Sequence, residues 1–159
     1  MRRVLCALAV AALAYGSAPS AFARTPAPAL KDACAYLTKE DATTALGEAV
    51  TGPQSKPTFD TGGGGTASSC EYSGSGINRV HLNLIVMTPA QATIYAGLCA
   101  KKTKDGLSGL GPVACWYNDK HGELQVLKGT TFLSIEMHRS GDPTEAIKGV
   151  AKAVYGRLP

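Results

Sequence analysis

The sequence predicts an α+β fold in which helices pack on an antiparallel sheet of about five strands. Three observations carry this prediction. Apolar and polar residues alternate from Val80 to Met87, with the period of two that is typical of a half-buried strand. Thr88 and Asp142 each precede a proline and open a stretch with helical spacing of apolar residues. The three strands expected after Val113 are joined by short turns, which require antiparallel pairing.

The first residues have the features of a cleaved export signal. Arg2 and Arg3 precede an uncharged, mostly apolar run, and Ala21-Phe22-Ala23 fits a signal peptidase site. The run is shorter than the roughly 20 residues of a membrane-spanning helix. We therefore expect a periplasmic or secreted protein without a transmembrane segment, divided into a signal peptide (1–23), a spacer (24–30) and one α+β domain (31–159).

The composition of the mature chain excludes some classes of partner. Removing 23 of the 159 residues leaves 136, enough for one domain, with 14 basic and 12 acidic side chains. This balance argues against a nucleic-acid partner. Lys101, Lys102 and Lys104 form a basic cluster where a helix is expected to end, and cations there complement the helix dipole. A docking patch for an anionic surface is the alternative.

The first expected helix has Thr38 as its N-cap residue and Glu40 and Asp41 in its first turn, and it ends at Gly47. Prolines and four consecutive glycines predict a loop over Pro53–Ser69. No Lys-Ser or Lys-Thr follows the glycines, as it would in a phosphate-binding loop. A strand around Cys70 to Tyr72 is expected after this loop.

The second helix is expected to begin with Thr88 as N-cap, Pro89 at the first helical position and Gln91 closing a capping box. We expect its apolar face to consist of Ile94, Tyr95 and Leu98. Three strands (113–117, 124–127 and 132–138) and a last helix follow, and the apolar stripe of that helix contains Ile147, Val150, Ala151, Val154 and Leu158. The expected order is helix, two strands, helix, three strands, helix.

One sheet face is predicted to lie under the helices. Alternation places about nine apolar side chains on this face, and burying each contributes roughly 1.5–3 kcal/mol. They are Val80, Leu82, Leu84, Val86, Leu124, Val126, Leu133, Ile135 and Met137.

The cysteines predict two disulfides. Four cysteines remain after the signal, none in a Cys-x-x-Cys pair, which favours disulfides over a metal site in an exported domain. Three pairings are possible. We predict Cys34–Cys70, which would close the first helix and the loop against the sheet. We also predict Cys99–Cys115, which would join the second helix to the next strand.

A spaced set of short motifs resembles a known group of proteins. The motifs are Cys34-Ala35-Tyr36-Leu37-Thr38, Ala45-Leu46-Gly47, Ser69-Cys70-Glu71-Tyr72, Leu110-Gly111-Pro112-Val113-Ala114-Cys115-Trp116 and Leu124-Gln125-Val126. The set resembles small exported bacterial domains of unknown function, many of them lipoproteins, with a PsbP-like α/β/α sandwich. The resemblance implies a fold and supplies no catalytic residues. The chain lacks a lipobox cysteine, so no lipid tether is expected.

Two groups of residues are candidate binding sites. Alternation places His81, Glu136 and His138 on the face opposite the apolar one. As a metal site they would still need a further ligand that the sequence does not identify, so we expect no metal or cofactor, and a solvated polar face is the alternative. Trp116 could floor an apolar groove beside Ile85, Met87, Leu127 and Phe132. Alternatively, the first helix and the Gly-rich loop cover this patch as a second core.

No catalytic motif emerges. Gly-x-Ser-x-Gly and paired carboxylates for glycoside hydrolysis are both missing from the sequence. We expect a non-enzymatic binding or interaction domain of the cell envelope, with a small molecule or an envelope protein as partner. The alternatives are a small envelope-acting hydrolase and a protein inhibitor that acts through the 53–69 loop.

Overall fold

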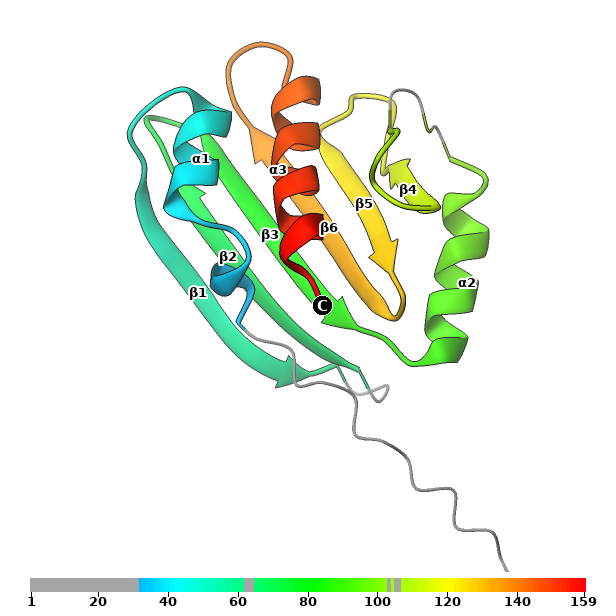
Figure 1. Cartoon of the computed structure of the whole chain (residues 1–159). Helices are drawn as coiled ribbons and strands as arrows, with labels where there is room; N and C mark the ends of the chain where they lie inside the picture. The colour runs from blue at the N-terminus through cyan, green and yellow to red at the C-terminus, as the bar shows by residue number, and fades with distance from the viewer. Residues whose placement is uncertain (1–31, 62–64, 103, 105–106) are drawn as a thin grey trace, which may run out of the picture.

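The computed structural model describes residues 32–61, 65–102, 104 and 107–159, and the expected signal peptide and spacer lie outside them. The described chain has the predicted α+β fold, with a six-stranded antiparallel sheet of order β1-β2-β3-β6-β5-β4 (Figure 1). The elements are η1 (Ala33–Ala35), α1 (Lys39–Leu46), β1 (Thr51–Asp60), β2 (Thr66–Ser73), β3 (Arg79–Val86), α2 (Pro89–Cys99), β4 (Val113–Trp116), β5 (Glu123–Lys128), β6 (Thr131–His138) and α3 (Thr144–Arg157).

The β3–β6 pair lies at the centre of the sheet and carries the predicted apolar face. Leu82 pairs with Ile135 and Leu84 with Leu133, and all four side chains are fully buried. Eight of the nine side chains predicted for this face lie in the main core, whereas Val86, at the end of β3, is only half-buried. We call this the front face and the opposite one the back face.

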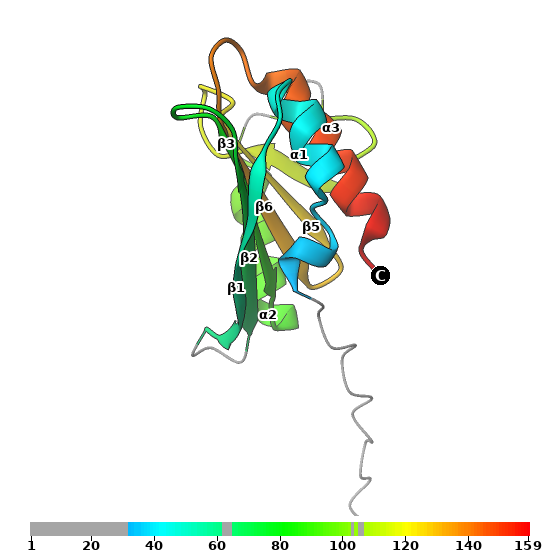
Figure 2. The same cartoon turned by 90° about the vertical axis from the view of Figure 1, so that its left-hand side faces the viewer.

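Helices α1 and α3 cover the front face, and Figure 2 shows them together on one side of the sheet. The capping box of α1 between Thr38 and Asp41 is present, and Gly47 ends the helix with a φ of 72°. The predicted stripe of α3 is buried. The start and end of α1 and the apolar stripe of α3 are therefore confirmed. The expected start of α3 at Asp142-Pro143 is not, because the helix begins at Thr144 with Pro143 as N-cap and has no side-chain cap.

The segment predicted as a loop over Pro53–Ser69 instead contributes two strands, and the loop prediction is wrong. β1 pairs with β2 alone, at the edge of the sheet, and its ten residues are all exposed. Register shifts occur between Thr51 and Gln54 and between Lys56 and Phe59, where the two prolines lie. A proline lacks the N–H of a ladder bond, but an edge strand with bulges accommodates it.

Helix α2 packs differently from the prediction in two respects. Its capping box at Thr88 and Gln91 is confirmed, but Ala92 and Cys99 are its buried residues, whereas Ile94 and Leu98 are exposed. It also packs on the back face, where it covers a small second core. The buried residues of this core are Ala92, Leu127 and Phe132. The partly buried residues Ile85, Met87, Tyr95, Ala96 and Val113 pack against this core.

Both predicted disulfides are confirmed. Cys34–Cys70 links the segment before α1 to β2, and Cys99–Cys115 links the end of α2 to β4. The bridges span 36 and 16 residues of sequence. Each therefore removes loop entropy from the unfolded chain, with the larger effect for the longer loop.

We expect the Cys34→Ala/Cys70→Ala variant to lose about 4 kcal/mol of unfolding free energy and the Cys99→Ala/Cys115→Ala variant about 3 kcal/mol. Urea denaturation of both variants and of the oxidised wild type measures this. Equal stability of all three proteins would contradict the assigned role of the bridges.

Candidate functional site

The structure brings together the polar residues that the sequence placed on one face. His81 lies opposite Glu136 in the register of β3 and β6, on the back face. The His138 Nε2 and Glu136 Oε1 atoms are 2.6 Å apart, and the two side chains are 40% and 43% exposed. Among the described residues, no group of three or more His, Cys, Asp and Glu side chains could hold a metal ion.

A pocket of about 370 Å³ adjoins this pair at the end of the back face. Ser134, the nearest hydroxyl along β6, donates its hydrogen bond to Glu123 Oε1 at 2.6 Å, and Gln125 Nε2 donates to the same oxygen. A serine nucleophile would require its hydroxyl to face a base such as histidine. The pocket lining is Tyr117, Asn118, Lys120, Gly122, Glu123, Glu136, Met137 and His138.

The predicted apolar groove is not formed as expected. Trp116 pairs with Leu124, is 1% exposed and lies in the main core on the front face. The prediction placed it on the wrong face because α2 was expected to pack on the same side as α3. Since Cys115 reaches α2 on the back face, alternation turns Trp116 to the front. The remaining groove residues, Ile85, Met87, Leu127 and Phe132, lie in the second core, which is covered by α2 rather than by the first helix.

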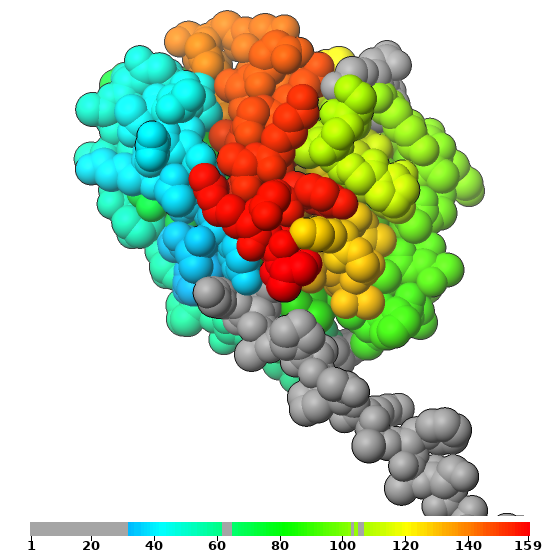
Figure 3. Space-filling model, in the orientation of Figure 1, coloured from blue at the N-terminus to red at the C-terminus, as the bar shows by residue number. Residues whose placement is uncertain are grey.

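The larger hollow lies between α1 and α3 on the front side of the molecule, and we call it the helix cleft. Figure 3 shows this side, with the two helices next to each other. The helix cleft has a volume of about 460 Å³. Its lining is Glu40, Asp41, Thr44 and Ala45 from α1, and Glu145, Ala146, Gly149, Val150 and Arg157 from α3.

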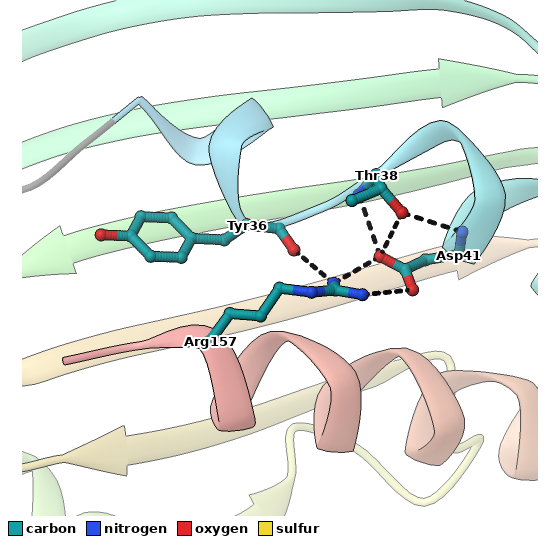
Figure 4. A network of polar contacts seen from close by, with 4 residues as sticks. All are labelled: Tyr36, Thr38, Asp41 and Arg157. Atoms are coloured by element: carbon teal, nitrogen blue, oxygen red, sulfur yellow. Dashed lines mark hydrogen bonds and ion pairs between the residues drawn. The ribbon is translucent and has the colours of Figure 1, made fainter.

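An arginine–carboxylate pair joins the two helices at one end of the helix cleft (Figure 4). Arg157 Nη1 and Nη2 donate to Asp41 Oδ2 and Oδ1 at 2.6 and 3.0 Å, and Nη1 also donates to the Tyr36 carbonyl at 2.7 Å. The Thr38 N–H and hydroxyl donate to Asp41 Oδ2 as well. The same carboxylate thus caps α1 and binds the last turn of α3.

A second arginine holds the other end of α1. Arg139, in the connection between β6 and α3, donates from Nη1 to the Ala45 carbonyl at 2.6 Å. The last carbonyls of a helix have no partner within the helix. Since Arg139 and Arg157 fix both ends of α1, the walls of the helix cleft are held in place without a ligand.

Negatively charged side chains outnumber positively charged ones in the lining of the helix cleft. Arg157 neutralises Asp41, and Lys148 lies 2.7 Å from Glu145. Glu40 is exposed and, of the three carboxylates in the lining, is the one without a hydrogen bond or close ion pair among the described residues, although Arg157 also attracts it electrostatically. The lining therefore presents net negative charge beside an apolar surface of Ala45, Ala146 and Val150.

Gly149 keeps the helix cleft open. A Cβ atom added there would have no heavy atom within 4 Å, so packing does not require glycine at this position. Glycine inside a helix also costs roughly 0.5–1 kcal/mol relative to alanine. A larger residue at Gly149 would project into the space between α1 and α3.

Sequence reasoning found Asp41 only as a residue of a first helical turn and did not find Arg157. The two residues are separated by 116 positions. No local pattern relates residues so far apart, and the one available signal was the placement of both at helix ends.

Searches against known protein families, curated proteins and solved structures found no match to this chain. Within the described residues, no helix combines the length and the apolar character needed to cross a bilayer. The candidate site is therefore derived from geometry alone.

The Asp41 carboxyl links stability to pH. Burial would raise its pKa, but hydrogen bonds from Arg157 and Thr38 outweigh burial and lower that pKa below the usual value. A group with a lowered folded-state pKa stabilises the fold above its unfolded pKa of about 4, and this contribution is lost as the pH falls through the folded value.

We expect Asp41→Asn to lose about 1–2 kcal/mol of unfolding free energy at pH 7, since Arg157 is partly exposed and solvent screens the pair. The difference from wild type should shrink as the pH falls below about 4. Urea denaturation between pH 7 and about pH 3 measures this difference, with Glu145→Gln as the control because the Glu145 side chain is 86% exposed. A difference that does not change with pH would contradict the linkage.

Proposed function

We propose that this chain is a non-enzymatic binding domain that takes a small ligand with a cationic group in the helix cleft. The observation that carries the proposal is a preformed hollow of about 460 Å³ with net negative charge and a floor of small apolar side chains. This volume lies within the roughly 300–1,000 Å³ of small-molecule sites. A primary amine would lie near Glu40, and a short apolar body would lie against Ala146 and Val150.

Preorganisation supports binding in the helix cleft. Walls that are already fixed reduce the ordering cost of association. Arg157 and Arg139 fix both ends of α1, and the Cys34–Cys70 disulfide holds the preceding segment on β2. A ligand would therefore enter a hollow that needs no rearrangement of its two helices.

The same lining argues against catalysis there. Asp41 accepts hydrogen bonds from Arg157 and Thr38, and its lowered pKa keeps it ionised at neutral pH, so it is a poor general acid. The lining contains no histidine or cysteine, and Thr44 is its one hydroxyl. The hydrolase alternative gains no support from the back-face pocket either, because Ser134 donates to Glu123.

The location that we propose is the periplasm or the extracellular space. Two disulfides fit an oxidising compartment. The alternative of an inhibitor that acts through the 53–69 loop is less well supported, since most of the described part of that segment lies in strands β1 and β2.

Filling the helix cleft tests the proposal. We expect Gly149→Leu to weaken the binding of butylamine and spermidine at least tenfold while the protein stays folded, because the added side chain occupies open space. Gly156→Ala is the matched control, since it lies in the same helix, also has open space at its Cβ position and is outside the lining. Amide chemical shifts in ligand titrations measure the affinity, with butanol as the uncharged probe.

A second variant tests the contribution of negative charge to binding without filling the helix cleft. Glu40→Gln should weaken amine binding and leave the weak binding of butanol unchanged, since it removes the negative charge that lacks an ion pair. The proposal fails if the two amines shift no helix-cleft amide in the wild type, or if Gly149→Leu binds them as well as Gly156→Ala does.

A further inference from the structure

Helix α2 has apolar residues on both sides but is covered on only one. Tyr95, Ala96 and Cys99 face the sheet, whereas Ile94 and Leu98, one helical turn apart on the outside, are 66% and 54% exposed. A helix that is apolar all round is normally buried. The outer side of α2 is thus an unpartnered apolar surface at the margin of the molecule, away from α1 and α3 (Figure 1).

Contacts with the sheet fix the orientation of this surface. The Cys99–Cys115 disulfide ties the C-terminal end of α2 to β4. The Tyr95 hydroxyl donates to Gln125 Oε1 at 2.9 Å, and its ring meets that of Phe132 edge-on at 4.6 Å. With its inner side bonded in this way, α2 cannot rotate to bury Ile94 and Leu98.

The charge on and directly after α2 is mainly positive. Lys101, Lys102 and Lys104 follow the helix, the sequence from Thr88 to Lys104 contains no acidic residue, and a single acid, Asp105, comes next. The Lys102 ammonium lies 4.3 Å from the centre of the Tyr117 ring, which is itself 55% exposed. Aliphatic, aromatic and cationic side chains are thus combined at one end of the molecule.

We propose that the outer side of α2 docks on the surface of an anionic phospholipid bilayer. An interfacial helix inserts its apolar side chains below the headgroups, while nearby lysines contact anionic headgroups and an aromatic ring lies at the interface. Ile94 and Leu98 would insert, Lys101 and Lys104 would contact phosphates, and Tyr117 with Lys102 would lie at headgroup depth.

The charge pattern favours a lipid surface over a second copy of the chain. Packing of two α2 helices against each other would bring lysine clusters together or place them against the positive N-terminal ends, with no carboxylate on α2 to offset them. In addition, the two aliphatic side chains protrude from a convex helix, which fits a deformable planar surface.

Co-sedimentation with vesicles tests the proposal. The exported protein is mixed with vesicles of equal parts phosphatidylglycerol and phosphatidylcholine, and separately with vesicles of phosphatidylcholine alone. We expect binding to the anionic vesicles that weakens at least tenfold in half-molar salt. Leu98→Ser should weaken it about tenfold, and the double variant Lys101→Glu/Lys104→Glu by more than tenfold.

Two control variants match these changes. Ile77→Ser removes an isoleucine that is 73% exposed in the turn between β2 and β3, and Lys152→Glu reverses an exposed lysine on α3. Both should bind the anionic vesicles like wild type. The proposal is overturned if wild type does not bind, if it binds both vesicle types equally, or if a control variant weakens binding as much as its α2 counterpart. It is also overturned if Leu98→Ser instead abolishes a dimer in sedimentation equilibrium.

Discussion

The pairing of β3 with β6 is the constraint on which the rest of the structure depends. It joins the part of the chain before α2 to the part after it, and the other strands add outward on either side. Both strands alternate apolar and polar residues, and their register aligns the apolar ones on the front face. A shift of one residue would move all of these side chains to the back face. The positions of α1, α3 and the helix cleft between them follow from this register.

The two sheet edges are protected in different ways. β1 is exposed and long, but its prolines and register shifts interrupt the regular row of N–H and C=O groups that another strand would need. β4 has only four residues and is tied by Cys115 to α2. Binding by addition of a strand is therefore disfavoured at both edges.

Local signals in the sequence were sufficient for most of the fold. The N-cap at Thr38, the capping box at Thr88, the alternation in β3 and the stripe of α3 each depend on neighbouring residues, and each was predicted correctly. Both disulfides followed from the order of the elements. The strand β1 was missed because proline and glycine normally break strands, and only the edge position makes them acceptable.

What the sequence did not reveal depends on contacts between distant residues. The side of the sheet that α2 covers is not encoded in its own periodicity, since α2 is apolar on both sides. The side on which α2 packs also determines which face of the sheet the Trp116 side chain lies on. The helix cleft depends on the pair of Asp41 with Arg157 and on the missing side chain at Gly149, neither of which forms a motif.

Residue-resolved hydrogen exchange of the folded protein tests the central role of the β3–β6 pair most directly. Amides that exchange only through global unfolding show the highest protection. The hydrogen-bonded amides of β3 and β6 around Leu82, Leu84, Leu133 and Ile135 should form this slowest group, and those of β1 should exchange much faster. Higher protection in β1, or in α2 alone, than at the β3–β6 pair would contradict this account.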